Sequence, residues 1–408
     1  MAIEVRTPPP GEVRRFLEVG GKTFAEETTA ESAERDENVL DPGRLYAAYD
    51  GEAIVGTAAD FELSLTVPGG ELPAAGVTLV GVLPTHRRRG IMTQLMRTEL
   101  DAIAARGEPL AILWASEEAI YGRFGYGMAT LRASIEADRD RIRFRGDPPP
   151  VGSVRIIDEE EAARVLPPIY DRVRRATPGM FARSEEWWKN YRLPDPEHHR
   201  RGAGPRFFAV LELDGVDEGY ARYRVKDDWK DGVPASSLRV LEALATSPLA
   251  TRELWRFLFG IDLIAKVEFW FLPPDHPLLL LVTEPRRLRL RLGDALWLRI
   301  VDVEQALSGR TYAADGELTF ELTDAFRPES AGVWRLEASG GEARVTRADA
   351  AGAELLLDVA DLACVYLGGF TFQQLASAGR VEERAEGALE RADALFRTPS
   401  APWCPEIF

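Results

Sequence analysis

The first part of the chain carries two short apolar runs on either side of a turn. Residues 45–49 and 53–57 are rich in apolar residues, and Asp50-Gly51 between them is a dipeptide typical of a tight hairpin. Apolar residues then recur at helical spacing over 91–103, before Gly107, which suits a helix end. The pattern predicts a strand hairpin followed by an amphipathic helix, and the short apolar run after Gly107 predicts a buried strand.

A strand that ends in a basic, glycine-containing turn precedes this helix. The first N–H groups of a helix have no partner within it, and the helix dipole adds positive charge there. One side chain among Arg87, Arg88 and Arg89 adds a charge-assisted contact to phosphate, and Gly90 lets the backbone come close to a ligand. The segment therefore predicts a pyrophosphate cradle. The residues expected at the cradle are Arg88, Arg89, Gly90, Ile91, Met92 and Thr93, and the strand before it is expected to contact the same ligand through Val80, Gly81 and Val82.

The same order of strand, loop and helix recurs with a changed loop. Apolar runs over 207–211 and 220–225 flank a second Asp-Gly turn, and the run 238–244 leads into an apolar helix face near 254–258. The intervening loop, residues 245–250, contains no arginine and no glycine. We therefore expect a second copy of the fold that lacks the anion site.

Composition and pattern divide the chain into three regions. Residues 146–150 are rich in glycine and proline, as a linker is, and near residue 286 the pattern changes again. There, alternating strands are followed by helical segments near 358–368 and over 371–396. The first two regions predict α/β domains with a mixed, mostly antiparallel sheet and flanking helices, and the third predicts an α+β domain. The domain limits are set at 1–147, 151–285 and 286–408.

Charge and cysteine content narrow the classes of function. The net charge of −16 disfavours nucleic acid and anionic membranes as partners and suits a cationic substrate. Two cysteines in 408 residues argue for a reducing compartment. Neither the cysteines nor the four histidines have the spacing of a metal site, and no secretory leader or membrane span is visible. We expect a cytoplasmic protein without a metal.

Two motifs resemble those of one enzyme family. Residues 87–92 resemble the coenzyme A signature of GCN5-related N-acetyltransferases (GNATs), although Met92 replaces its usual small last residue. Together with the run Ile-Tyr-Gly-Arg-Phe-Gly-Tyr-Gly at 120–127, they make the chain similar to the Eis (enhanced intracellular survival) family. The resemblance is specific over 77–127 and looser elsewhere. It implies tandem GNAT domains with only the first active, a sterol-carrier-protein-like third domain, acetyl-CoA as cosubstrate and a homo-hexamer.

The resemblance also assigns a general acid. Tyr121 matches the family's proton donor, and a phenol with a pKa of about 10 is protonated at neutral pH and able to protonate a thiolate. By spacing alone Tyr126 is a rival, and either tyrosine also suits an ordinary core position. Ser116 and Glu117 match family positions that contact the coenzyme, with helix capping as the alternative role of Ser116.

The chain ends in an apolar segment where a frayed terminus would be polar. Trp403, Ile407 and Phe408 indicate that this tail docks. The Eis family uses its terminal carboxylate as general base, and Phe408 matches the last residue of that family. Glu406 is a second candidate base, and a tail that only packs is the non-catalytic alternative. Ile407 replaces the acidic penultimate residue of family members, which leaves substrate contacts there open.

Carboxylates are dense over residues 26–37, directly after Phe24. Acids beside aromatic rings suit an aminoglycoside, a polyamine or a lysine side chain, so we expect Phe24 and Glu26 to contact the acceptor. A solvated helix face is the plainer alternative. The predicted activity is direct acetyl transfer from acetyl-CoA to an amine. The alternatives are a non-catalytic lipid or small-ligand carrier working through the third domain, and an acyltransferase for longer acyl-CoA.

Overall fold

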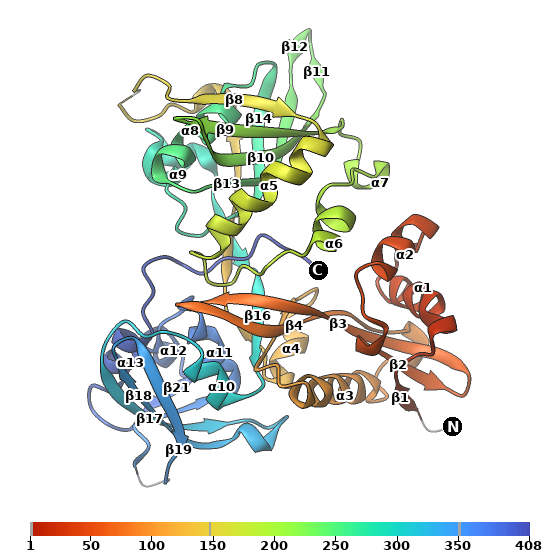
Figure 1. The fold of residues 1–408 in the computed structure, drawn as a ribbon, viewed down its shortest axis with the longest axis vertical. Coiled ribbons are helices and arrows are strands. Elements are labelled where there is room, and N and C mark those ends of the chain that lie inside the picture. Colours follow the sequence, from red (N-terminus) through yellow and green to blue (C-terminus); the bar gives the residue numbers. More distant parts are fainter. Residues whose placement is uncertain (1–2, 147, 350–351) are drawn as a thin grey trace. The chain divides into compact units, whose positions relative to one another are not determined.

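The computed structural model describes residues 3–146, 148–349 and 352–408, and the chain forms two compact units (Figure 1). Described residues up to 130, those of 295–399, and 406–408 form one unit. Residues 131–294 and 400–405 form the other. The chain therefore passes from one unit to the other several times, the last time directly before Glu406.

The first unit contains the hairpin, helix and buried strand that the pattern predicted. Its first sheet has the order β1-β2-β3-β4-β5-β16-β6. The strands are β1 (Glu4–Arg6), β2 (Leu45–Asp50), β3 (Ala53–Val67), β4 (Gly70–Val82), β5 (Leu110–Trp114), β6 (Gly127–Met128) and β16 (Leu296–Ile300). The helices before and between them are α1 (Val13–Thr23), α2 (Ala30–Glu37), α3 (Ile91–Ala105) and α4 (Glu118–Tyr121).

Helix α3 packs along β2, β3 and β4 through its apolar face (Figure 1). Leu95, Met96 and Leu100 on that face are fully buried. The helix ends before Gly107, whose φ of +75° is left-handed and favours glycine, as predicted. The buried face therefore fixes the helix whose first turn is the predicted anion site.

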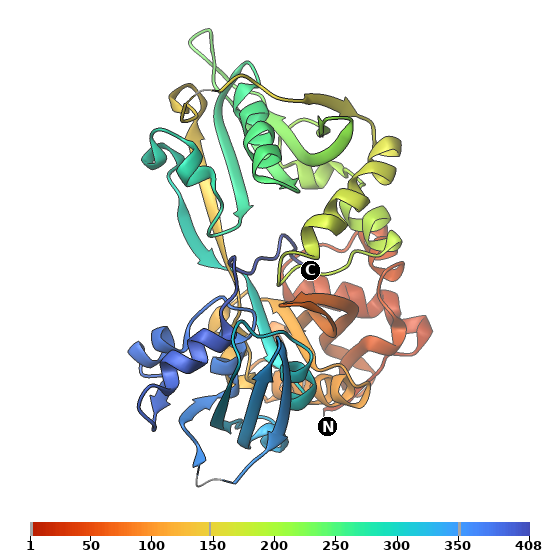
Figure 2. The same cartoon turned by 60° about the vertical axis from the view of Figure 1, so that its left-hand side comes forward.

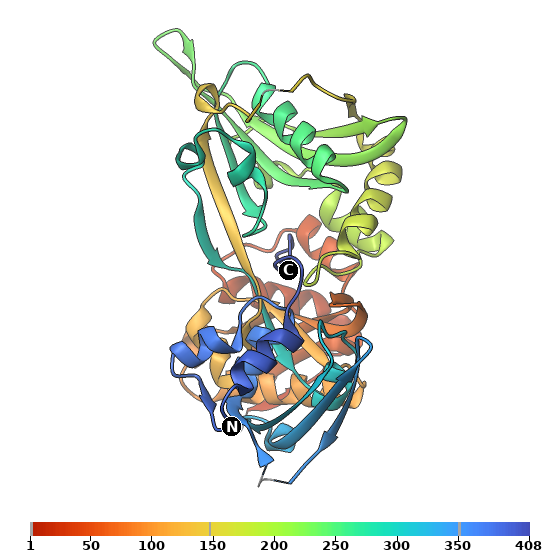
Figure 3. The ribbon, with the colours of Figure 1, turned by 90° about the vertical axis from the view of Figure 1, so that its left-hand side faces the viewer.

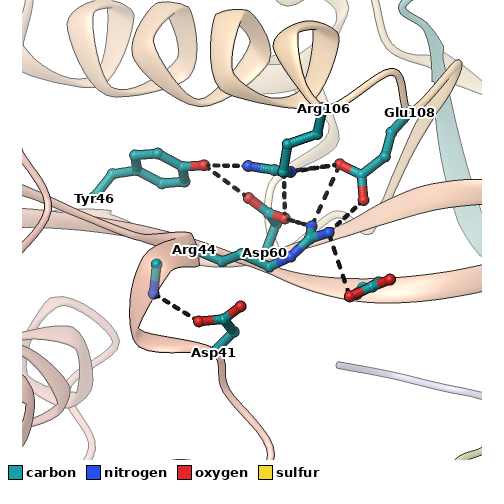
Figure 4. A network of polar contacts seen from close by, with 8 residues as sticks. Asp41, Arg44, Tyr46, Asp60, Arg106 and Glu108 are labelled. Atoms are coloured by element: carbon teal, nitrogen blue, oxygen red, sulfur yellow. Dashed lines mark hydrogen bonds and ion pairs between the residues drawn. The ribbon is translucent and has the colours of Figure 1, made fainter.

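A buried polar network fastens the far end of α3 to the sheet (Figure 4). The Arg106 guanidinium donates to Asp60 at 2.8 Å, to the Tyr46 hydroxyl at 2.9 Å and to Glu108 at 2.9 Å. Arg44 donates to Glu108 at 2.6 Å and also to Asp60. Because Asp60 is fully buried, the two guanidinium groups compensate a charge that would be costly alone.

The second unit holds the second sheet, of order β15-β7-β14-β13-β10-β9-β8, with α8 lying along it (Figure 3). Its strands are β7 (Leu131–Asp138), β8 (Ser153–Ile157), β9 (Arg206–Leu213), β10 (Val216–Lys226), β13 (Ser236–Ala245), β14 (Ile264–Leu272) and β15 (Arg291–Asp294), and β11 (Trp229–Lys230) pairs with β12 (Val233–Pro234). Its helices are α5 (Glu159–Arg174), α6 (Glu185–Trp187), α7 (Glu197–Arg200), α8 (Pro248–Gly260) and α9 (Leu278–Leu281). The strands, turn and helix of the predicted second copy are all present.

A further sheet in the first unit has the order β19-β18-β17-β20-β21, and Figure 2 shows the blue helices of this region beside it. Its strands are β17 (Gly316–Thr323), β18 (Gly332–Ser339), β19 (Glu342–Arg347), β20 (Leu355–Asp358) and β21 (Val381–Glu383), and its helices are α10 (Val303–Ser308), α11 (Val359–Tyr366), α12 (Phe372–Ser377) and α13 (Ala388–Phe396). The helical segment predicted over 371–396 is wrong as one element. It breaks at Gly379 and Gly387, both left-handed, and β21 between them pairs with β20.

Two strands lie on the other side of the domain limits set from composition. The limit at residue 147 places β7 with the first domain, but β7 pairs with β14 and β15 of the second sheet. Strand β16 follows the limit at 286, yet it pairs with β5 and β6 of the first sheet. Within the predicted linker, Asp147 lies outside the described residues.

Candidate active site

A cleft of about 550 Å³ lies in the first unit beside the place where β4 and β5 part. The two strands pair in parallel, Ala74–Gly76 against Leu110–Ile112, and each then continues without this partner. The lining comes from the end of β4, the basic turn, the first turn of α3 and the segment that leads into α4. Motifs far apart in the sequence therefore share one cavity.

A bulge shapes the end of β4. Leu79 has a φ of +51°, and the register with β3 shifts between Thr57 and Ala59. Such a φ is costly for leucine, and bulges of this kind often lie beside active sites. The Thr57 hydroxyl donates to the Leu79 carbonyl at 2.7 Å and holds the bulge. After it, Val80, Gly81 and Val82 all line the cleft, as predicted.

The basic turn reverses at Arg88, whose φ is +63°. Arg87 and Arg88 line the cleft, whereas the Arg89 guanidinium lies 3.6 Å from the Asp50 carboxylate and is not part of the lining. The turn ends at Gly90, with φ +77°, and apart from its two chain neighbours none of the described residues has an atom within 4 Å of where a Cβ would be on it. Backbone at Gly90 is therefore open to close approach by a ligand.

The first turn of α3 supplies the positive end of a helix dipole. Ile91, Met92 and Thr93 line the cleft, and Gly90 at the N-cap has no side chain to satisfy their N–H groups. The first N–H that returns to the turn is that of Gln94, which donates to the Gly90 carbonyl at 3.1 Å. Free N–H groups, a helix dipole and two guanidinium groups suit a pyrophosphate.

Tyr121 and Tyr126 pack edge to face, with ring centroids 6.0 Å apart. Burial, with the buried Glu99 carboxylate as the second cause, raises the pKa of Tyr121 to about 12, while a hydrogen bond with Ser116 acts in the opposite direction. Burial raises the pKa of Tyr126 well above its ordinary value, and its hydroxyl has no hydrogen-bond partner among the described residues. Ser116 and Ile120, the residue before Tyr121, line the cleft, whereas neither tyrosine is among its lining residues.

Ser116 and Glu117 both line the cleft, in agreement with their predicted placement. The alternative role of Ser116 as a helix cap is wrong, because α4 begins at Glu118 with Glu117 at its N-cap and no side-chain cap. The segment thus presents its polar groups to the cleft and does not use them to close its own helix.

The C-terminal residues dock in the first unit. The Phe408 ring packs edge-on against Phe61 with centroids 6.3 Å apart, and a Cβ on Gly76 would lie 3.3 Å from that ring. Glu406 is 1% exposed, whereas Ile407 is 54% exposed. Gly76 is the last residue of β4 that pairs with β5, so the end of the chain lies beside the parting strands.

On the acceptor side, the structure brings one of the two predicted residues to the cleft. Phe24 lines it and is 41% exposed, whereas Glu26 is exposed and lies outside the lining. Much of the acidic segment forms α2, which begins after a Thr29 cap, and Glu37 at its end binds Arg14 at 2.7 Å. This segment therefore includes ordinary helix capping and ion pairing.

Several lining residues were not singled out from the sequence. Ile120 and Arg123 lie inside the second motif, so their positions were a usable signal, whereas Arg87 was already one of the three candidate arginines. Thr23 had no such signal, because its proximity depends on how α1 meets β4: a Cβ on Gly81 would lie 2.0 Å from the Thr23 hydroxyl. The other unpredicted lining residues are Ala25 and His86.

Within the described part of the chain, no helix is long and apolar enough to cross a membrane. In the same residues, no group of three or more histidine, cysteine or acidic side chains is arranged to hold a metal ion.

Comparison with known proteins identifies the domains of the chain. Residues 4–129 and 179–300 each match an acetyltransferase (GNAT) domain family, and residues 303–405 match a sterol carrier protein domain. An uncharacterized N-acetyltransferase of Streptomyces avermitilis is 42% identical over 93% of this chain and 93% of its own. The N-acetyltransferase Eis of Mycobacterium tuberculosis is 37% identical over 86% of this chain and 84% of its own.

A solved structure extends the likeness to the whole chain. Eis1 from Mycobacterium abscessus superimposes with a TM-score of 0.86 at 34% identity, covering 99% of this chain and 100% of its own. The predicted fold, two GNAT domains followed by a sterol-carrier-like α+β domain, is confirmed. With relatives similar over most of its length, the chain belongs to the Eis family of GNAT N-acetyltransferases.

Proposed function

We propose that the protein transfers the acetyl group of acetyl-CoA directly to an amine of a cationic acceptor, such as an aminoglycoside, a polyamine or a lysine side chain. The observation that carries this proposal is the cleft that joins the bulged end of β4, the Arg88–Gly90 turn and the Ser116–Glu117 segment. The net charge of −16 favours a cationic acceptor.

The proposed cosubstrate site uses the two ends of this cleft. Arg87, Arg88 and the first N–H groups of α3 would hold the pyrophosphate, and Gly90 would let it approach. The backbone of Val80–Val82 would bind the pantetheine arm, with the N–H near Val82 facing the thioester oxygen, where negative charge develops.

The proposed chemistry divides two protons between two groups. The terminal carboxylate of Phe408 accepts a proton from the acceptor ammonium, directly or through water, and the amine nitrogen then attacks the thioester carbon. As the new C–N bond forms and the C–S bond breaks, Tyr121 gives its proton to the departing thiolate. The acylated nitrogen releases its second proton to solvent, and the Tyr121 phenolate takes a proton back from solvent. With its pKa raised to about 12, Tyr121 is protonated at neutral pH, as an acid must be.

A thiol-release assay with a panel of amines tests the activity and the acid together. We expect Tyr121→Phe to lower kcat by about 10²–10⁴ while the KM for acetyl-CoA stays close to that of the native enzyme. Tyr126→Phe is the matched control, because it removes a buried hydroxyl that has no partner in the described structure. A fully active Tyr121→Phe variant would remove this tyrosine from the mechanism.

Two further expectations accompany the proposal. Longer acyl-CoA donors are the alternative cosubstrates, so the same assay is run with acetyl- and myristoyl-CoA, and acetyl-CoA should give the higher kcat/KM. We also infer a cytoplasmic homo-hexamer from the family resemblance. Light scattering of the purified protein measures its mass against the 45.3 kDa of one chain.

A further inference from the structure

The second sheet contains a pair of parting strands like that of the first. Strands β13 and β14 pair in parallel from Ser236 to Val240, and beyond this point each continues without the other. Helix α8 follows β13 directly, as α3 follows the basic turn after β4. The second GNAT domain therefore keeps the architecture of a pantetheine cleft, although its loop lacks the arginine and glycine residues of the first.

The C-terminal segment of the chain, residues 400–405, occupies part of the space beside these parting strands. A cavity of about 150 Å³ lies here, and its wall includes residues 243–245 of β13 together with Ser400, Ala401 and Trp403. Trp403 is 2% exposed and belongs to one hydrophobic cluster with Leu244 of β13 and Leu166 of α5. A side chain of this size in a core cluster holds the tail firmly.

Backbone hydrogen bonds hold the same segment. The Trp403 N–H donates to the Pro178 carbonyl at 2.8 Å, and the Ala401 N–H donates to the Asp275 carboxylate at 2.7 Å. A terminal segment without such ties is usually disordered. Residues 400–405 are thus tied to the second unit, and Glu406 is the first residue that belongs to the first unit again.

We propose that the parting strands of the second GNAT domain have become the anchor of the C-terminal segment, and that Trp403 is a positioning residue for the terminal carboxylate of Phe408. The anchor shortens the free tail to the few residues after Pro405, which raises the effective concentration of the carboxylate at its site. This inference rests on the proposed role of that carboxylate as the base.

The test compares full-length Trp403→Ala and Trp403→Phe with Trp334→Ala. Trp334 is a second buried tryptophan, 5% exposed, in β18 and far from the tail in sequence, and its ring N–H donates to the Ser330 carbonyl at 3.1 Å. Asp275→Ala serves as a milder variant that removes one tie and leaves the core intact. Two readouts are measured for each variant: release of Phe408 by carboxypeptidase A, and kcat with the KM for acetyl-CoA.

For Trp403→Ala we expect carboxypeptidase to release Phe408 at least ~10-fold faster, because cleavage follows the population of the open tail. We expect kcat to fall by about 10-fold or more with an unchanged KM for acetyl-CoA, since a misplaced base is costly. Trp403→Phe and Asp275→Ala should change both readouts in the same direction by less. Trp334→Ala should leave the tail protected.

A folded Trp403→Ala enzyme with a protected tail and full kcat would overturn the anchor. The same holds if Asp275→Ala and Trp403→Phe leave both readouts at native values while Trp403→Ala fails to fold. Failure of the base itself gives another result. In that case the tail is released faster in Trp403→Ala, but neither this variant nor an enzyme extended beyond Phe408 loses turnover.

Discussion

The two GNAT domains begin their central helices in opposite ways. Helix α3 follows Gly90, which offers no side chain, so the first N–H groups of the helix remain available to a ligand. Helix α8 follows Ser247, whose hydroxyl accepts the Ala250 N–H at 3.2 Å, and Pro248 at the first position has no N–H to offer. The N-terminus of α8 is thus capped within the protein, whereas the first backbone N–H groups of α3 can be hydrogen-bonded by a ligand.

The parting strands differ in the same sense. Beside β4 and β5 there is a cleft of about 550 Å³, and beside β13 and β14 there is a cavity of about 150 Å³ partly walled by the tail. The first GNAT domain thus has an open cleft and free backbone N–H groups among its described residues. In the second GNAT domain, the corresponding cavity is smaller and the helix N-terminus is capped. A domain can lose a binding site by becoming better capped and better filled, with its fold unchanged.

The largest expected effect comes from the end of the chain. A few residues appended after Phe408 convert its carboxylate into a neutral amide and keep every native side chain. We expect kcat to fall by about 10²–10⁴, the usual share of general base catalysis. The KM for acetyl-CoA should hardly change, because the turn at Gly90 is a separate part of the cleft. Full turnover in the extended enzyme would contradict the role of the Phe408 carboxylate as base and leave Glu406 as the next candidate.

A half-buried histidine in the second unit offers a further test of the comparison. His276 lies in the wall of the smaller cavity and accepts the Leu278 N–H through Nδ1 at 3.1 Å, and burial lowers its pKa to about 3. In the unfolded chain its pKa is about 6.5, so between these values the unfolded state binds more protons. The contribution of neutral His276 to the free energy of unfolding is therefore fully present above pH 6.5. Below pH 6.5 it decreases by up to about 1.4 kcal/mol for each pH unit.

We therefore expect the native protein to lose up to about 2.7 kcal/mol more of its unfolding free energy than His276→Asn between pH 7 and 4.5. Denaturant titrations of both proteins at the two pH values measure this difference. The Asn side chain keeps an acceptor for the Leu278 N–H. Parallel losses in the two proteins would show that His276 is not the group that titrates.

A smaller effect is expected where α1 meets β4. A Cβ on Gly81 would lie 2.0 Å from the Thr23 hydroxyl oxygen, whereas Ala245 at the end of β13 pairs with Gly219 of β10. We expect Gly81→Ala to cost about 1–3 kcal/mol of stability through overpacking. The Thr23 Cβ would also lie 2.5 Å from the new methyl group, so the double variant with Thr23→Gly, which removes the whole side chain, should recover part of this loss in thermal unfolding. Additive losses would show that another contact is responsible.

The sequence predicted the elements whose signals are local. Helix α3 and strand β5 followed from the spacing of apolar residues and the position of Gly107, and residues 80–82 and 90–93 line the cleft. The sheet that β7 and β16 each join was not predictable, because these strands pair with strands that lie far away along the chain. Arg89 was assigned to the cleft, but the positive φ of Arg88 turns it towards Asp50. Such a reversal at a non-glycine residue has no signature in the sequence.

The central claim is that each chain has one cosubstrate site, in the first domain. Calorimetric titration with acetyl-CoA tests it most directly, with the native protein and Gly90→Val side by side. The account predicts one site per native chain and at least ~10-fold weaker binding, or about 1.4 kcal/mol, in Gly90→Val, since a branched side chain there is strained at φ +77° and blocks the approach of the pyrophosphate. Two sites per chain, or native affinity in folded Gly90→Val, would contradict it.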